Sequence, residues 1–313
     1  MHFVFVDQDI DLNVLNGREI IAPLLEIGTV TCFDDAPCSQ DTLYERAKDA
    51  DVIFVSVNRF DNELIDKLQK LKIAQFMGIG YSNYFDVEYC EKKGIKVLGV
   101  GEYGSNAVAE YTLALMLDAI RGISRSDGKM KKAIWSMDGV LGGEISGATV
   151  GIIGTGAIGS LVARKTAALG ATVLGVDIYP NKFLAEEGIV NYVDIETLMQ
   201  KSDIVSVHLK YTQETKGYVS ADLLSLMKPS SVFINTARAQ VVDYDALQRM
   251  LENRKIRCAA LDVHYEEPLS DWGLAQMENV IATPHLAYFT ESANTNLLKK
   301  SVESVLQNLP ENY

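Results

Sequence analysis

The 313-residue chain is poor in the residues that mark several special classes of protein. It has four cysteines, seven prolines and two tryptophans, and no apolar run approaches the roughly 20 residues that a membrane-spanning helix requires. The cysteines are scattered, with no Cys-x-x-Cys pair and no histidine at metal-ligand spacing, which indicates reduced structural thiols and no metal site. The N-terminus lacks a basic segment and a cleavage-site pattern. These absences favour a cytoplasmic protein.

Basic residues are also scarce. The chain has 29 Lys and Arg against 42 Asp and Glu, which gives a formal net charge of −13. Nucleic acid and anionic membranes both bind to basic faces, so this balance argues against either partner, although a local cluster could still hold a small anion. Hydrophobic residues make up 48% of the chain, which excludes general disorder. At about 150 residues per domain, the length predicts roughly two domains.

Short β-branched runs alternate with helical patterns along most of the chain. Helices are expected at Thr42–Ala50 and Asn62–Leu71, among others. The expected strands are Phe3–Val6, Asp51–Val57, Ile73–Met77, Ile95–Val100, Thr149–Ile153, Thr172–Asp177, Ile204–His208, Ser231–Asn235, Ala259–Val263 and Asn279–Ala282. This alternation predicts βαβ crossovers and parallel sheets, and the two series of strands predict two α/β domains.

The longest helical pattern, Asn106–Ile123, lies at the junction between the two series. The pattern places the domain boundary near residue 100. A second amphipathic helix is expected at Ser292–Leu309, and no strand follows it. The pattern alone does not assign this last helix to either domain.

Two stretches match the pattern Gly-x-Gly-x-x-Gly, at residues 99–104 and 154–159. A dinucleotide-binding fold needs a second strand after the helix, ending in a carboxylate that accepts from the ribose hydroxyls. Only the second stretch has this context, because the strand at 172–177 follows its helix and ends at Asp177. The loop Gly154–Gly159 is therefore the predicted cofactor site, and Gly99–Gly104 is predicted to be a turn between domains.

The predicted loop binds an anion without a basic patch. Its glycines permit a tight turn, and the amides of Gly156, Ala157 and Ile158, at the positive end of a helix dipole, would hold a pyrophosphate. The carboxylate of Asp177 would repel a 2′-phosphate. The sequence therefore favours NAD over NADP, although Lys182 lies close enough in sequence to leave the alternative open.

Three residues follow expected strands of the second series and together suit the reduction of a 2-oxo acid. Arg238 could hold the carboxylate and polarise the carbonyl, and His285 could donate the proton. Glu267 could keep that imidazole protonated, because a neighbouring carboxylate favours the charged form. Each also has a structural interpretation: Arg238 as a helix cap or surface ion pair, Glu267 as part of an acidic run, and His285 as a core histidine. His264 is a further candidate nearby.

At these residues the chain resembles the NAD-dependent D-2-hydroxyacid dehydrogenases. The resemblance covers nearly the whole chain and depends on motifs that are specific in combination. They are Val108-Ala-Glu110, Thr149-Val-Gly-Ile-Ile-Gly-Thr-Gly-Ala-Ile-Gly159, Asn235-Thr-Ala-Arg238 with Val242-Asp243, Leu261-Asp-Val263 with Glu267-Pro268, and Thr283-Pro-His285.

The resemblance implies a role for each of these residues. Arg238 binds the substrate carboxylate and carbonyl, His285 is the acid/base, and Glu267 is its paired carboxylate. The side chain of Asp262 and the backbone of Thr236-Ala237 contact the nicotinamide end. His264 stands where the family usually has an aromatic residue, which assigns it to packing. Cofactor contacts are implied for Gly154, Gly156, Ala157, Ile158, Gly159, Asp177, Thr236, Ala237, Arg238 and Asp262, and substrate contacts for Gly78, Ile79, Gly80, Tyr103, Arg238 and Tyr288.

The resemblance also implies two Rossmann-like, doubly wound parallel-sheet domains with a cleft between them. Residues 1–99 plus 287–313 would form a discontinuous substrate-binding domain, and residues 100–286 the NAD-binding domain. The long helix would contribute to a homodimer interface. The sequence departs from the family at Ala239 and Lys210, which replace a usual Gly and Pro, and in the aromatic loop at Tyr81–Phe85, whose relation to the substrate pocket stays open.

The segment after His285 and the stretch at Tyr103 resemble the D-lactate dehydrogenase branch. Aromatics at Tyr103, Tyr288 and Phe289 would favour a small apolar side chain, although they could equally pack between domains. The predicted function is the reversible reduction of pyruvate or a small apolar 2-oxo acid to the D-2-hydroxy acid by NADH. The alternatives are a hydroxypyruvate or glyoxylate reductase, and an NADH-sensing, corepressor-like interaction protein on the same fold.

Overall fold

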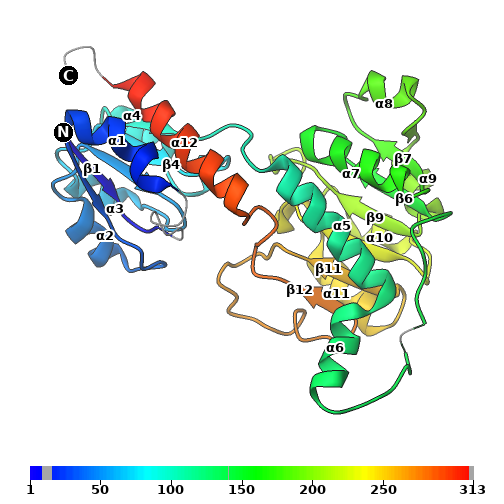
Figure 1. The fold of residues 1–313 in the computed structure, drawn as a ribbon. Coiled ribbons are helices and arrows are strands. Elements are labelled where there is room, and N and C mark those ends of the chain that lie inside the picture. The colour runs from blue at the N-terminus through cyan, green and yellow to red at the C-terminus, as the bar shows by residue number, and fades with distance from the viewer. Residues whose placement is uncertain (9–15, 140, 310–313) are drawn as a thin grey trace. The chain divides into compact units, whose positions relative to one another are not determined.

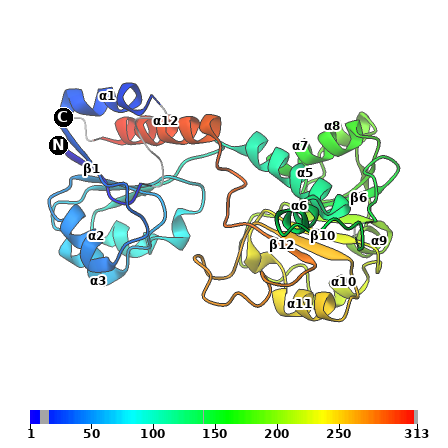
Figure 2. The same ribbon diagram turned by 60° about the horizontal axis from the view of Figure 1, so that its bottom comes forward.

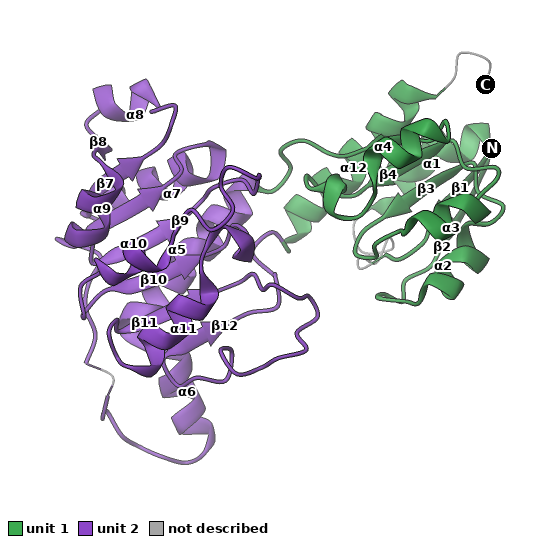
Figure 3. Cartoon of the chain, turned by 180° about the vertical axis from the view of Figure 1, so that it is seen from behind, with its two compact units in different colours: residues 1–104, 289–313 green, residues 105–288 purple. Residues whose placement is uncertain are grey.

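The computed structural model describes residues 1–8, 16–139 and 141–309, and the chain divides into two compact units (Figure 3). Unit 1 comprises Met1–Gly104 and Phe289–Tyr313, and unit 2 comprises Ser105–Tyr288. The junctions therefore follow Gly104 and Tyr288, whereas the sequence predicted them after residues 99 and 286. Within the described ranges, no helix has the combined length and apolarity that crossing a membrane would need.

Unit 1 is built on a five-stranded parallel sheet in the order β2-β1-β3-β4-β5. Its strands are β1 (His2–Phe5), β2 (Thr29–Cys32), β3 (Val52–Val55), β4 (Ile73–Phe76) and β5 (Lys96–Leu98). Its helices are α1 (Gly17–Ile27), α2 (Gln40–Ala47), α3 (Asn62–Lys67), α4 (Val87–Lys92), α12 (Glu291–Asn308) and the 3₁₀ turn η1 (Tyr81–Asn83). Figure 2 shows α1 and α12 on one face of this sheet and α2 and α3 on the other.

The last helix of the chain completes unit 1. Thr290 caps α12 by accepting a hydrogen bond from the amide of Ala293, and the helix then packs beside α1. Leu297, Leu298 and Val302 reach the buried side chains of the sheet. This packing settles the question that the sequence pattern left open, because it assigns the terminal helix to the first domain.

Unit 2 contains a seven-stranded parallel sheet in the order β12-β11-β10-β9-β6-β7-β8. Its strands are β6 (Thr149–Ile153), β7 (Thr172–Val176), β8 (Asn191–Tyr192), β9 (Ile204–Val207), β10 (Val232–Asn235), β11 (Cys258–Leu261) and β12 (Val280–Ala282). Its helices are α5 (Ser105–Arg121), α6 (Ile123–Lys131), α7 (Ala157–Ala168), α8 (Lys182–Glu186), α9 (Ile195–Lys201), α10 (Ala221–Ser225), α11 (Tyr244–Glu252) and the 3₁₀ turn η2 (Ala239–Val241).

The two faces of the unit 2 sheet are covered by different helices (Figure 1). Residues of α5 and α7 pack on one face, and those of α9, α10 and α11 pack on the other. Burial on both faces explains why the strands consist almost entirely of apolar residues. The prediction of two parallel-sheet α/β domains is therefore confirmed.

Several predicted elements have different ends in the structure. The expected helix Asn106–Ile123 is interrupted at Gly122, whose φ of 62° is left-handed, and α6 begins directly after it. The helix expected at Asn62–Leu71 ends at Lys67. The stretch Gly99–Gly104 is a loop between β5 and α5, at the end of the first part of unit 1. It is thus a connection rather than a phosphate loop within a βαβ unit.

Candidate active site

The predicted site residues of unit 2 follow the carboxyl ends of its strands. Arg238 lies three residues beyond β10, Glu267 follows β11, and His285 lies three residues beyond β12. Because β10, β11 and β12 are neighbours in a parallel sheet, their carboxyl ends share one edge. Open α/β sheets bind ligands at this edge.

The turn that carries Arg238 is fastened by the side chain of Asn235. The Asn235 carbonyl oxygen accepts from the amide of Ala237 at 3.0 Å, and its amide nitrogen donates to the carbonyl of Arg238 at 3.1 Å. The Arg238 guanidinium donates to the Ala237 carbonyl at 2.7 Å and is half-buried. It forms no ion pair with any described residue. Most of its donors can therefore face an anionic ligand.

Glu267 and His285 form the predicted pair. The distance from His285 Nδ1 to Glu267 Oε2 is 2.7 Å, and the other carboxylate oxygen accepts from the amide of His264 at 2.9 Å. Burial opposes ionisation of Glu267, but the hydrogen bond and the charge of His285 outweigh it and hold the pKa of this carboxyl below its ordinary value. Glu267 is therefore a carboxylate that can stabilise an imidazolium.

Asp262 shapes the segment that presents His285. Its buried carboxylate accepts hydrogen bonds from the hydroxyl of Thr283 at 2.6 Å and from the amides of Leu286 and Ala287, each at 2.8 Å. Burial raises the pKa of Asp262, although these donors act in the opposite direction. Within the loop that they close, His285 has a φ of 57°, an uncommon and strained conformation for a non-glycine residue. The predicted contact of Asp262 with the nicotinamide end stays a prediction.

His264, which the sequence assigned to packing alone, belongs to the same arrangement. Its ring Nε2 lies 3.0 Å from the carbonyl of Thr283, which can only accept, so this nitrogen is the donor. The ring thereby ties the segment after β11 to the segment after β12. Its position shortly after the β11 exit, three residues before Glu267, was the available signal for this role.

The glycine loop has the close approaches that its sequence implies. A Cβ atom on Gly159 would lie 1.9 Å from the carbonyl oxygen of Gly154, whose own φ of 92° is left-handed. A Cβ on Gly156 would meet no atom within 4 Å, so the space before the N-terminus of α7 is open. Burial lowers the pKa of the adjacent His208 to about 3, so this ring adds no positive charge to the loop. An anion here would depend on backbone amides and the helix dipole.

Asp177 stands at the end of β7 with its carboxylate fixed. One oxygen accepts from the amide of Thr155 at 2.6 Å and from its hydroxyl at 3.2 Å, and the other accepts from the amide of Tyr179 at 2.8 Å. The phenol of Tyr192 on β8 also donates to the Thr155 hydroxyl at 2.9 Å. The sequence did not indicate a role for Thr155 or Tyr192, because a contact between the loop after β6 and strand β8 has no signature in residue spacing.

The predicted substrate residues of unit 1 are partly accounted for by packing. A Cβ on Gly78 would lie 2.5 Å from the Phe76 ring, which stacks on Tyr84 with the ring centres 4.1 Å apart. Phe85 is buried in the same core. Tyr84 and Phe85 therefore explain most of the aromatic loop as core packing. Ile79 is 48% exposed, and the backbone of Gly78–Gly80 lies at the carboxyl end of β4.

Tyr103 and Tyr288, both predicted to contact substrate, belong to different units. Tyr103 packs partly against the core of unit 1 beside α12. The ring of Tyr288 lies 5.9 Å from that of His285, in an edge-to-face arrangement. Tyr288 is therefore the one of the two that unit 2 places beside a predicted catalytic side chain.

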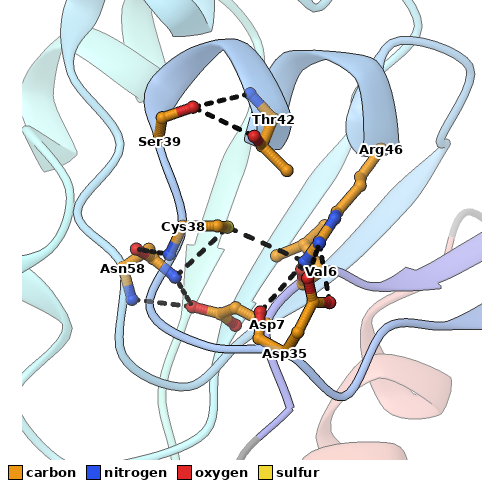
Figure 4. A network of polar contacts seen from close by, with 8 residues as sticks. All are labelled: Val6, Asp7, Asp35, Cys38, Ser39, Thr42, Arg46 and Asn58. Carbon is orange, nitrogen blue, oxygen red and sulfur yellow. Dashed lines mark hydrogen bonds and ion pairs between the residues drawn. The ribbon is translucent and has the colours of Figure 1, made fainter.

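A polar network occupies the neighbouring part of the unit 1 sheet edge (Figure 4). The buried carboxylate of Asp7 accepts from the amides of Ser56, Val57 and Asn58 and from the Asn58 side chain. Burial raises the pKa of Asp7. Because its own carboxylate occupies these amides, the turn after β3 cannot offer them to an external anion.

Fold and site together define a class of protein. A parallel sheet in the order of unit 2, a glycine loop opening α7 and an acidic residue ending β7 are the features of a Rossmann-type dinucleotide-binding protein. The residues present fit NAD, because the glycine loop is open where a pyrophosphate would approach and Asp177 is fixed where a ribose would lie.

Comparisons with known proteins make this class more specific. The family model described as "D-isomer specific 2-hydroxyacid dehydrogenase, NAD binding domain" matches residues 113–287. D-3-phosphoglycerate dehydrogenase of Methanocaldococcus jannaschii is 36% identical over 295 residues, which cover 93% of this chain and 56% of that protein. Glyoxylate reductase of Korarchaeum cryptofilum is 34% identical over 283 residues, which cover 88% of this chain and 83% of that protein.

A solved structure is similar over nearly the whole chain. The D-lactate dehydrogenase from Aquifex aeolicus, complexed with NAD and lactic acid, has a TM-score of 0.80 and 30% identity, covering 97% of this chain and 94% of that one. The chain spans about half the length of the phosphoglycerate dehydrogenases among these relatives. The chain belongs to the D-isomer-specific 2-hydroxyacid dehydrogenase family.

Proposed function

We propose that the protein is an NAD-dependent D-2-hydroxyacid dehydrogenase that reversibly reduces a 2-oxo acid to the D-2-hydroxy acid. The observation that carries this proposal is the 2.7 Å contact between His285 and Glu267, at the same sheet edge as the Arg238 guanidinium, which forms no ion pair with any described residue. The two units then have different tasks. Unit 2 binds NAD, as the family match to residues 113–287 supports, and unit 1 supplies further substrate contacts.

Each residue has a defined part in the reaction. The Arg238 guanidinium binds the substrate carboxylate and polarises the carbonyl that is to be reduced. His285 Nδ1 faces Glu267, so its Nε2 is left to donate the proton that the carbonyl oxygen takes up. Glu267 stabilises the imidazolium before transfer and orients the ring throughout. Bound NADH supplies the hydride that adds to the carbonyl carbon. In the reverse direction His285 accepts the hydroxyl proton.

We propose NAD rather than NADP as the preferred cofactor. The Asp177 carboxylate is held in place by Thr155 and Tyr179, and its negative charge would repel a 2′-phosphate while accepting from ribose hydroxyls. Replacing Asp177 with Ala should weaken NADH binding and narrow its advantage over NADPH. Fluorescence titration with both nucleotides measures this ratio, and an unchanged ratio would contradict the proposed role.

The proposed substrate is pyruvate or a modestly larger apolar 2-oxo acid. Its support is the edge-to-face placement of Tyr288 beside His285 and the occupation of the Ser56–Asn58 amides by Asp7, which removes one anchor for a second anion. A hydroxypyruvate or glyoxylate reductase is the second candidate. It is favoured by the glyoxylate reductase relative, which this chain matches over 83% of that protein.

We also propose a homodimer formed through unit 2. The segment after α6 exposes Trp135, Met137 and Leu141 at 87%, 85% and 93% of their surface. The Leu141 end of this segment is nevertheless anchored, because Arg257 donates to the Leu141 carbonyl at 2.9 Å. Large apolar side chains on an anchored segment are typical of an association surface. Trp135→Asp should give monomers in analytical ultracentrifugation, whereas a wild-type monomer would refute the proposal.

We further propose a cytoplasmic location, which the four unpaired cysteines support.

A screen of NADH and NADPH oxidation across a panel of 2-oxo acids tests reaction, cofactor and substrate together. The panel should contain pyruvate, larger apolar 2-oxo acids, glyoxylate, hydroxypyruvate and 3-phosphohydroxypyruvate. We expect NADH oxidation to be fastest with the apolar acids. A preference for glyoxylate or hydroxypyruvate would establish the second candidate. Nucleotide binding without oxidation by any acid would favour an NADH-sensing interaction protein.

A further inference from the structure

A buried phenol connects the two loops that carry Arg238 and Glu267. Tyr244 is the first residue of α11, and its side chain is 5% exposed. Its hydroxyl lies 3.0 Å from the side-chain nitrogen of Asn235 and 3.0 Å from the carbonyl of Val263. Burial strongly raises the pKa of Tyr244, so the phenol stays protonated. It therefore accepts from Asn235 and donates to Val263.

This arrangement uses both N–H donors of the Asn235 side chain and its oxygen. Its oxygen accepts from the Ala237 amide, and its nitrogen donates to both the Arg238 carbonyl and the Tyr244 hydroxyl. The Asn235 side chain closes the turn that carries Arg238, and Tyr244 holds that side chain in place. A buried polar network in which each member is paired restricts its residues to one geometry.

The other end of the phenol reaches the β11 exit. Val263 follows β11 and precedes the segment that leads to Glu267, the partner of His285. The single hydroxyl of Tyr244 thus joins the backbone around the substrate-binding arginine to the backbone leading to the acid/base pair. Binding a 2-oxo acid at both points needs a fixed separation between them, because small misplacements of reacting groups are costly.

We propose that Tyr244 is a positioning residue that holds the Arg238 turn in the conformation that binds the substrate carboxylate. The proposal deepens the proposed function and depends on it for the identity of the ligand. The effect on the turn itself does not depend on catalysis. It can therefore be measured separately, by hydrogen exchange.

The chain offers a matched control in Tyr265. Its ring packs edge-to-face against Tyr244, with ring centres 5.2 Å apart, and its hydroxyl donates to the carbonyl of Val242. Tyr265→Phe therefore removes the contacts of this phenol with the backbone of Val242 and Tyr244 but leaves the Tyr244 hydroxyl and Asn235 in place. Tyr244→Phe keeps the ring and removes the hydroxyl that Asn235 and Val263 share.

The first measurement is hydrogen exchange, followed by mass spectrometry, of peptides that cover residues 235–242. We expect exchange in Tyr244→Phe to be about tenfold faster than in the wild type, because the Asn235 side chain loses its hydrogen bond to the phenol. Tyr265→Phe should leave the amide of Ala237 unchanged. Equal exchange in Tyr244→Phe and the wild type would overturn the proposal. Asn235→Asp, which can donate neither to the phenol nor to the Arg238 carbonyl, should show at least this acceleration and serves if Tyr244→Phe does not fold.

The second measurement is steady-state kinetics with the best 2-oxo acid of the panel. Tyr244→Phe should raise KM about tenfold and change kcat less than about threefold, with unchanged NADH affinity, whereas Tyr265→Phe should change neither. Faster exchange with an unchanged KM would overturn the role in substrate binding. If none of the 2-oxo acids supports NADH oxidation by the wild type but the difference in hydrogen exchange is present, the proposed function fails. The role of Tyr244 in holding the Arg238 turn is then still supported.

Discussion

The two units differ in how they treat buried polar side chains. Among the residues that the structure describes, four buried side-chain atoms have no hydrogen-bond partner, and all four belong to unit 1: Gln8 Oε1, Gln75 Oε1, Asn294 Oδ1 and Ser301 Oγ. In unit 2, the buried polar groups around the site are paired, as the three donors to Asp262 show. An unpaired buried polar group costs about 1–3 kcal/mol.

The difference indicates where the molecule has fixed its geometry. Unit 2 holds its strand exits with side-chain hydrogen bonds from Asn235, Tyr244 and Asp262, so the proposed reacting groups are placed before any ligand arrives. Unit 1 carries desolvation penalties in its interior, two of them on α12. Substitutions that break a buried hydrogen bond in unit 2 should therefore lower the free energy of unfolding more than substitutions that remove an unpaired polar group from unit 1.

The largest contrast is expected from two glycine substitutions. In Gly159→Ala, the new Cβ would lie 1.9 Å from the Gly154 carbonyl oxygen, part of the backbone of the cofactor loop. In Gly78→Ala, it would meet the ring of Phe76 at 2.5 Å, and a side chain can shift. We expect Gly159→Ala to cost about 4 kcal/mol or more, or to abolish NADH binding, and Gly78→Ala to cost about half as much. Chemical denaturation and nucleotide titration of both variants measure this contrast. A smaller loss of stability and of NADH binding in Gly159→Ala than in Gly78→Ala would contradict the expected contrast.

A smaller effect is expected from Asp262→Asn. The variant keeps one side-chain oxygen and replaces the other by an NH2 group, so it cannot accept from both amides, those of Leu286 and Ala287, and unfolding should become about 2 kcal/mol easier. The loss should depend on pH. Because burial raises the folded-state pKa of Asp262 above its unfolded value of about 3.9, the ionised carboxylate opposes folding.

This opposition is absent at low pH and grows as the pH rises from about 4 towards the folded-state pKa of Asp262. The amide of the asparagine variant does not titrate. The stability gap between the wild type and Asp262→Asn should therefore be larger at pH 4 than at pH 7, as urea denaturation at both values would show. A gap that widens with pH would mean that the carboxylate favours folding when charged.

The smallest effects come from a pair of buried serines. Ser202 in unit 2 donates to the Leu198 carbonyl at 2.7 Å, and the hydroxyl of Ser301 in unit 1 has no hydrogen-bond partner among the described residues. Both are fully buried. Ser202→Ala should destabilise the protein by about 1 kcal/mol, and Ser301→Ala should be neutral or stabilise α12 by about 0.5 kcal/mol. Thermal unfolding of the two variants would sharpen the comparison, and equal losses would show that pairing does not distinguish the units.

Much of the fold could be predicted from the sequence. The bounds of β6 are those predicted, because the apolar run Thr149–Ile153 ends directly at a glycine loop. By contrast, α1 contains Pro23, which argues against a helix interior, and the edge strand β2 is partly exposed rather than a buried apolar run, and both were missed. The helix expected to reach Leu71 stops at Lys67, because Leu68 and Leu71 are buried as irregular chain rather than as helix.

The proposed catalytic residues could be named from the sequence, but the contacts that hold them in place could not. Arg238, Glu267 and His285 stand at strand exits, which the order of strands already places on one edge. The contacts that fix them, such as Tyr244 with Val263, join residues far apart in sequence whose pairing depends on the packing of α11. Sequence spacing carries no record of such contacts. The aromatic loop is a different case, since the sequence left its relation to the substrate pocket open and the structure shows Tyr84 and Phe85 in core packing.

The most direct test of the central claim is a single-turnover measurement on His285→Ala. NADH-loaded enzyme is mixed with the preferred 2-oxo acid, and the loss of NADH absorbance is followed. Because the proposed role of His285 is to donate the proton from a ring held 2.7 Å from Glu267, we expect the rate to fall about a thousandfold with little change in NADH affinity. A rate within a few fold of the wild type would contradict the account.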